Sequence, residues 1–171
     1  GEAATPISMV ADGNSQGGPG EVAVPGTELL SAVILPGVLK PVRQVAPGIR
    51  VDILASDSTQ NLLQREADIA IRHARPDQSV LIARHLGDFG ANLYASTTYL
   101  DRAGRPRTPR DIADHDFVGN ADPERLMAPL HNMGVPVRPE NFVMSSANGV
   151  VSWELVKAGF GIAMLPQALG E

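Results

Sequence analysis

The sequence predicts an α/β fold with two mostly parallel sheets. Short segments with the alternation of half-buried strands are repeatedly followed by segments with apolar residues at helical spacing. The chain has 171 residues, 43% of them hydrophobic, which suits one compact unit or two small lobes. At this size folding buries about 70% of the unfolded surface, so a core needs no disulfide or metal. Cysteine is absent, which excludes disulfides, thiolate nucleophiles and cysteine-based metal sites.

The first half of the chain is expected to begin with a linker, because residues 13–20 are rich in glycine and other turn-forming residues. Residues 1–20 are therefore predicted to be a linker, and the folded part is predicted to start near Glu21. The elements expected after it are a strand at 22–24, a helix over 35–45 that begins or kinks at Pro36, a strand at 49–53, a helix over 58–66 and a strand over 68–72.

The second half continues the alternation. Thr108, followed by a proline and then an acid, has the pattern of a helix start, and Gly159 is expected to end the last helix in a left-handed conformation. Residues 120–138 carry three prolines and give no clear prediction. The other expected elements are strands at 81–85 and 92–95 separated by Gly87 and Gly90, strands at 117–118 and near 142–144, a helix over 151–158 and a buried strand at 162–165.

Charge and hydropathy narrow the class of protein. The formal charge is −5, from 14 basic and 19 acidic residues without a cluster of one sign, so the chain itself should not bind nucleic acid. Apolar runs are short and interrupted, and the N-terminus lacks the pattern of a signal peptide, so the chain is expected to be soluble.

Three kinds of chemistry are disfavoured by the residues. A serine triad lacks the Gly-x-Ser-x-Gly turn that exposes the nucleophile, and no paired acid and base lies at a spacing typical of an enzyme. No dinucleotide is expected, because residues 25–29 read PGTEL where a Gly-x-Gly-x-x-Gly turn would stand. We therefore expect no catalysis, no cofactor and no metal. The histidines, too scattered for a metal site, are His73, His85, His115 and His131.

Small polar residues follow several predicted strands, where open parallel sheets place their ligand crevice. Hydroxyls at a helix N-terminus suit a carboxylate or another anion. Each position also has a structural interpretation: Thr27, Ser58 and Ser146 or Asn148 are ordinary helix caps, and Arg72 can pair with a neighbouring acid. The residues at strand ends are Thr27, Ser56, Arg72, His73, Ser145, Ser146 and Asn148.

Several segments in series resemble the effector-binding domain of LysR-type transcriptional regulators. The opening is carried by LPGVL at 35–39 and APGIRVDI at 46–53, and the glycine-rich late element by AGFGIAMLP at 158–166. Between them stand READIAIR at 65–72, LYAS at 93–96, Tyr99-Leu100 and GRPRTP at 104–109. The resemblance covers residues 20–168 in order.

This resemblance implies a two-lobed fold like that of periplasmic binding proteins, with parallel or mixed sheets and a small organic effector between the lobes. Lobe 1 is expected over residues 21–94 and lobe 2 over residues 95–171. The effector contacts implied by the family are Gly26, Thr27, Glu28, Ser56, Gly119, Asn120, Ser145, Ser146 and Phe160, with Arg72 and His73 near the same mouth. Glu28 does not fit a site for an anion, because its carboxylate would repel a carboxylate effector. Either the Glu28 side chain points away from the effector, or the effector is neutral or cationic.

The family's architecture also implies partners. Its members carry an N-terminal winged helix-turn-helix that reads DNA, which nothing before residue 20 resembles, and their domains continue with a strand returning to lobe 1 and a closing helix. The chain is thus expected to be a shortened sensor domain of a cytoplasmic regulator. A helix near 30–45 is expected to pair with a helix near 149–158 of a second subunit, in a homodimer or homotetramer. The alternative is a periplasmic solute-binding protein of a transporter.

Overall fold

The computed structural model describes residues 4–11, 21–56, 69–72 and 82–170. The chain divides into two compact units, residues 4–89 and residues 90–171. The division falls inside one strand, β5 (Ile82–Tyr94), at whose end the sequence analysis placed the boundary between lobes. No helix in the described part of the chain is both long enough and apolar enough to cross a membrane.

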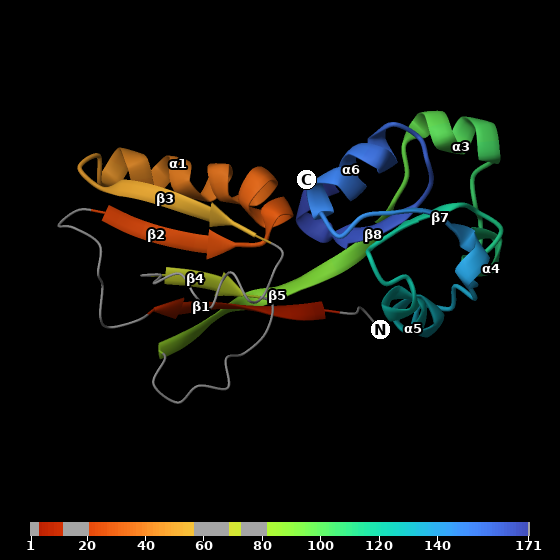
Figure 1. Ribbon diagram of the computed structural model, residues 1–171, viewed down its shortest axis with the longest axis horizontal. Helices are drawn as coiled ribbons and strands as arrows, with labels where there is room; N and C mark the ends of the chain where they lie inside the picture. The colour runs from red at the N-terminus through yellow and green to blue at the C-terminus, as the bar shows by residue number, and fades with distance from the viewer. Residues whose placement is uncertain (1–3, 12–20, 57–68, 73–81, 171) are drawn as a thin grey trace. The chain divides into compact units, whose positions relative to one another are not determined.

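The unit of residues 4–89 contains a parallel strand pair, β2 (Glu21–Gly26) and β3 (Arg50–Ala55). Helix α1 (Leu35–Val45) lies along this pair (Figure 1). Leu35 and Leu39 of the helix pack with Val24 and Val51 of the strands, and this apolar contact forms the core of the unit. Both strands and the helix confirm the predictions for these segments.

A wider helical turn, Leu30–Ile34, precedes α1, and in it the N–H of Leu35 donates to the carbonyl of Leu30, five residues back. Pro36 follows as the second residue of α1, and because the chain is already helical from Glu28, its missing N–H removes one hydrogen bond to the preceding turn. The helix therefore changes geometry next to Pro36, in agreement with the expected start or kink. Pro41 lies farther along, inside α1.

The expectation that the folded part starts near Glu21 is wrong. Strand β1 (Ala4–Ala11) pairs antiparallel with β4 (Ile69–Arg72), in a sheet of order β4-β1-β5-β8. The segment ATPISMVA contains Ile7, Met9 and Val10, which favour an extended chain. The turn-rich residues 13–20, on which the linker prediction rested, lie outside the described residues. So does the predicted helix at 58–66.

Strand β5 corrects a second expectation, because it is continuous where two strands separated by Gly87 and Gly90 were predicted. Both glycines lie inside the strand, so neither makes the turn that the sequence was taken to indicate. The end of β5 pairs antiparallel with β8 (Ala163–Pro166), with Asn92 opposite Leu165.

The unit of residues 90–171 is built around a parallel pair, β6 (Phe117–Gly119) and β7 (Phe142–Ser145), and a bridge from Phe117 to Ile162 places β8 beside β6. Its helices are α3 (Thr97–Ala103), α4 (Pro109–Ile112), α5 (Glu124–Asn132) and α6 (Gly149–Lys157), with short 3₁₀ turns at Pro139–Asn141 and Gln167–Gly170. The core side chains are Tyr99, Phe117, Leu130, Val135, Val137 and Ile162.

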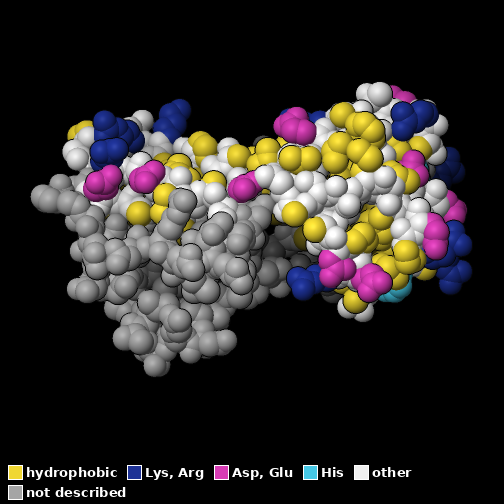
Figure 2. Space-filling model, viewed as in Figure 1, with side chains coloured by type: hydrophobic (Ala, Val, Ile, Leu, Met, Phe, Trp, Pro, Cys, Tyr) yellow, Lys and Arg dark blue, Asp and Glu magenta, His cyan; other side chains and the backbone are white. Residues whose placement is uncertain are grey.

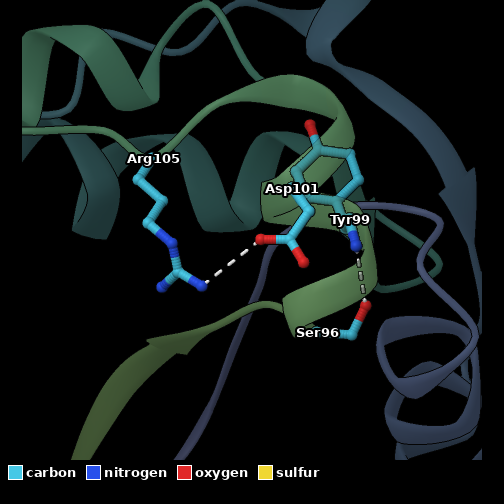
Figure 3. Close-up of polar contacts among 4 residues, drawn as sticks. All are labelled: Ser96, Tyr99, Asp101 and Arg105. Carbon is cyan, nitrogen blue, oxygen red and sulfur yellow. Dashed lines mark hydrogen bonds and ion pairs between the residues drawn. The ribbon is translucent and has the colours of Figure 1, made fainter.

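Local signals explain where these helices begin and end. Ser96 caps α3, since its Oγ accepts a hydrogen bond from the N–H of Tyr99 at 3.2 Å (Figure 3). An exposed ion pair between Asp101 and Arg105, 3.5 Å apart, follows at i,i+4 spacing. Thr108 caps α4 and Gly159 follows α6 with a φ of 85°, both as predicted.

Candidate functional site

The first group of predicted site residues lies where β2 and β3 end. These parallel strands are in register, with Gly26 opposite Ala55, and the N–H of Ser56 donates to the carbonyl of Gly26 at 2.9 Å. Thr27 follows immediately, and its carbonyl accepts the N–H of Ser31 at 2.9 Å as the helix begins. The structure therefore brings Gly26, Thr27 and Ser56 together, and we call them the β2–β3 edge cluster.

Charged residues predicted for the same site are placed less completely. Glu28 is the first helical residue after Thr27 and is half-buried, so a carboxylate side chain belongs to this edge of the sheet. Arg72 is the last residue of β4, opposite Ser8 of β1. The side chain of Arg72 and the whole of His73 lie outside the described residues. Their place in a site stays a prediction.

The second group lies where β6 and β7 end. Gly119 is opposite Ser145, and the N–H of Ser146 donates to the carbonyl of Gly119 at 3.1 Å. Asn120 follows Gly119, and its Oδ1 accepts the N–H of Asp122 at 2.9 Å. We call Gly119, Asn120, Ser145 and Ser146 the β6–β7 edge cluster. It lies in a different unit from the β2–β3 edge cluster.

The start of α6 adjoins the β6–β7 edge cluster and has its own polar network. The Oγ of Ser146 accepts the N–H of Asn148 at 3.1 Å, and Oδ1 of Asn148 accepts the N–H groups of Val150 and Val151 at 2.9 and 3.1 Å. Asn148 thus caps the helix, which is the structural interpretation of this residue. The hydroxyl of Ser145 is exposed at the end of β7.

Phe160 does not lie with the other predicted residues of its unit. It follows the C-terminal end of α6, whereas Ser146 precedes the N-terminal end. Nine helical residues at about 1.5 Å each put roughly 13 Å between these ends. The ring of Phe160 is 44% exposed.

The structure adds one residue to the β2–β3 edge that the sequence analysis did not single out. Ser31 is 6% exposed, and its hydroxyl has no hydrogen-bond partner among the described residues. A Cβ atom on Gly26 would lie 3.0 Å from this oxygen, so the glycine leaves room for the hydroxyl. The spacing of four residues between Ser31 and Leu35 was the available signal, because it puts both on the buried face of the helix.

The histidines that the structure describes with their side chains take part in local hydrogen bonds. Nδ1 of His115 lies 3.2 Å from the Tyr99 hydroxyl, and Nε2 of His131 lies 2.8 Å from the carbonyl of Val137. In the described ranges, no three His, Asp or Glu side chains are grouped so that they could hold a metal ion. His85 is in β5, and its side chain is outside what the structure describes.

Both clusters offer the same chemistry. Hydroxyl groups, one amide and backbone groups at the ends of parallel strands bind a small polar molecule through hydrogen bonds. Thr27, Ser56, Asn120 and Ser145 supply donors and acceptors without a fixed charge, and Glu28 contributes a negative charge to one cluster. Each cluster, taken by itself, can hydrogen-bond a small polar molecule.

Comparisons with known proteins agree on one family. Residues 15–171 match the LysR substrate binding domain. The chain is 36% identical over 126 residues to the HTH-type transcriptional regulator CrgA of Neisseria meningitidis serogroup C (strain 8013), an alignment that covers 72% of this chain and 42% of CrgA.

Solved structures give the same result. The regulatory domain of CrgA from Neisseria meningitidis superposes with a TM-score of 0.71 at 26% identity, covering 88% of this chain and 74% of that domain. The regulatory domain of AphB from Vibrio vulnificus, at 17% identity and a TM-score of 0.62, covers 88% of this chain and 76% of its own and supports the fold alone. The chain spans less than half the length of the curated relative CrgA.

Proposed function

Because the chain belongs to the LysR substrate-binding domain family, we propose that it senses a small organic effector for a bacterial transcriptional regulator. The observation that carries the proposal is the family match over residues 15–171, together with polar residues at the ends of two separate parallel strand pairs. The relatives are transcriptional regulators, which favours this function over that of a transport receptor. The proposed role is binding, without covalent chemistry.

The proposed mechanism is a population shift. An effector that binds one conformation of the domain better than the others moves the equilibrium by this difference in affinity. The change is passed to a winged helix-turn-helix domain that lies outside this chain and binds DNA in the cytoplasm. We propose that the effector contacts come from the two edge clusters and Glu28. The proposal does not depend on Arg72, His73 or Phe160.

The negative charge of Glu28 favours some classes of effector over others. A carboxylate bound beside Thr27 would be repelled by Glu28, whereas a neutral or cationic effector would not. Glu28→Gln should therefore tighten the binding of an anionic effector and weaken that of a cationic one. This variant separates the two classes before the effector itself is known.

The experiment is a thermal-shift screen of the chain against small carboxylic acids and their amide and amine counterparts, followed by calorimetric titration of each hit. We expect Thr27→Ala or Ser56→Ala to weaken binding roughly tenfold, because each removes one hydrogen bond to the effector, without unfolding the chain. Thr98→Ala, an exposed threonine in α3, is the matched control. Equal affinity of Thr27→Ala, Ser56→Ala and the control would refute the site.

We also propose that α1 pairs with α6 of a second copy. Along α1 and the turn before it, Val33, Val38 and Val45 are 42%, 55% and 85% exposed, and Val151 of α6 is 46% exposed. Exposed apolar side chains repeated along one helix are typical of an interface. Sedimentation of the double variant Val38→Glu/Val45→Glu should show a monomer, while Val143→Glu, at a 49% exposed valine in β7, should sediment like the parent. A monomeric parent chain would refute this pairing.

A further inference from the structure

A cavity of about 460 Å³ lies in the unit of residues 4–89, between the end of α1 and the start of β3. Its walls include Leu39 and Val42 of the helix and Val51 of the strand, and the loop Ala46–Ile49 closes one side. The volume falls within the range of about 300–1,000 Å³ that is typical of small-molecule sites.

The cavity is separate from the proposed effector contacts of the same unit. It adjoins Arg50, where β3 begins, whereas Ala55 and Ser56 lie where β3 ends. Five residues of extended chain at about 3.3 Å each put roughly 16 Å between the two places. The β2–β3 edge cluster therefore does not line it.

Two arginines give the cavity its charge. Arg43 and Arg50 both line it, and none of the described lining residues is acidic. Figure 2 shows basic side chains gathered over the end of this unit where α1 ends and β3 begins. Most of the remaining lining is aliphatic, so the cavity pairs an apolar body with a positive rim.

The guanidinium groups have capacity for an anion. Nη1 of Arg43 donates to the carbonyl of Pro47 and lies 3.4 Å from the carbonyl of Ile49, which holds the side chain against the loop. A guanidinium has five N–H donors, and these contacts use only one of its nitrogens. Arg50 pairs with Glu21 at 3.6 Å, and both side chains are so exposed, at 80% and 41%, that the pair is weak in water.

We propose that this cavity binds a small amphipathic carboxylate. Its apolar body packs against Leu39, Val42 and Val51, and its carboxylate meets Arg43 and Arg50. Apolar contact supplies affinity, and the guanidinium hydrogen bonds supply the preference for a negative charge. The carboxylate also competes with Glu21 for Arg50. The site is in contact with α1 and is distinct from the effector site proposed above.

The test uses ¹⁵N-labelled chain and three probes of one shape: sodium benzoate, benzyl alcohol and benzylamine. Benzoate should shift the amide resonances of Gly48, Ile49 and Val51 in a saturable way, and the alcohol and the amine should bind roughly tenfold more weakly or not at all. Arg50→Gln should weaken benzoate binding by about the same factor, and Ala46→Phe should abolish it by filling the cavity. Arg107→Gln, an exposed arginine in the other unit, is the matched control.

Three results would overturn the proposal. Benzoate shifts confined to residues 26–28, 56 or 145–148 would place the ligand in the effector site, and Thr27→Ala, which should leave the cavity unaffected, checks this. Unchanged affinity in both Arg50→Gln and Ala46→Phe, with circular dichroism confirming their folding, would also refute it. So would an affinity for benzoate no higher than that for benzyl alcohol and benzylamine, because the arginines would then give no preference for a negative charge.

Discussion

The phenolic oxygen of Tyr99 accepts a 2.8 Å hydrogen bond from the backbone N–H of Asp116. The side chain is 1% exposed and also contacts Nδ1 of His115, so the hydroxyl ties α3 to the start of β6. We expect Tyr99→Phe to lower the free energy of unfolding by about 1–3 kcal/mol, because the partly buried N–H loses its acceptor. Urea unfolding measures this. Tyr94→Phe, which removes a hydroxyl bonded to the exposed Gln167 carbonyl, should cost less.

Ionisation of the same tyrosine should lower the stability of the protein at alkaline pH. Burial raises the pKa of Tyr99, against the opposite effect of the Asp116 hydrogen bond. An unfolded tyrosine loses its proton near about pH 10, while the folded one keeps it to higher pH. Its contribution to stability is therefore complete below pH 10 and is lost as the pH rises through the folded pKa. The Tm should fall more steeply above pH 10 in the parent than in Tyr99→Phe, and parallel curves would contradict this.

Protonation of Asp111 should contribute to the loss of stability at acid pH. Its carboxylate accepts the N–H groups of Arg107 and Thr108, both at 2.9 Å, and these hydrogen bonds lower the pKa of Asp111. The stabilisation is then present above the unfolded pKa of about 3.9 and lost as the pH falls through the folded pKa. Asp111→Asn should lower the Tm at pH 7 and flatten its decline below about pH 4. Asp114→Asn, which changes an exposed acid nearby, should leave the Tm at pH 7 and its decline at acid pH unchanged. If the Tm of Asp111→Asn and that of the parent decline identically at acid pH, Asp111 does not stabilise the fold in this way.

Two glycine-to-alanine variants should have opposite effects. A Cβ on Gly161 would lie 2.5 Å from the carbonyl oxygen of Asp116, so the two backbones must separate. We expect Gly161→Ala to cost about 1–3 kcal/mol. Gly37 lies inside α1, and apart from its chain neighbours and the backbone of the helix itself no described atom lies within 4 Å of its would-be Cβ, so Gly37→Ala should stabilise the helix by about 0.5–1 kcal/mol. Thermal unfolding of both variants tests the pair, and a loss of stability in Gly37→Ala would count against the helix geometry.

Removing residues 1–11 should destabilise the unit of residues 4–89. Strand β1 lies between β4 and β5, so its loss leaves an edge of each strand without a hydrogen-bonded neighbour. Unpaired strand edges promote association between chains. We expect a lower Tm and concentration-dependent light scattering. A shortened chain that unfolds like the parent would show that β1 contributes little.

The fold was predicted best where one local signal was sufficient. The alternation of Val51 and Ile53, the cap at Thr108 and the glycine at Gly159 each indicated an element that the structure contains. The continuous β5 was missed because Gly87 was interpreted as a turn residue, although it lies within a strand of the four-stranded sheet. Tertiary context decides such positions.

Helix α5 shows a further limit. Pro129 lies inside the helix and removes one of its hydrogen bonds, so the sequence of residues 120–138 gave no clear prediction. In the structure Leu130 is completely buried and Leu126 and Met127 pack against the same core, and this apolar contact outweighs the lost hydrogen bond.

For the candidate site, the rule that ligands bind at the ends of parallel strands was enough to identify two groups of residues that the structure does bring together. It did not identify Ser31, because this rule selects residues that directly follow a strand, whereas Ser31 lies one helical turn further on, beside Gly26. Whether Phe160 belongs with Ser146 depends on the direction of α6, which local patterns do not give.

The pairing of β1 has a consequence for biosynthesis. Ser8 is opposite Arg72, 64 residues later in the chain. At about 5–20 residues per second, a ribosome needs roughly 3–13 s to make that intervening length. During this interval the segment ATPISMVA has emerged without its partner, and it is then exposed to chaperones and proteases.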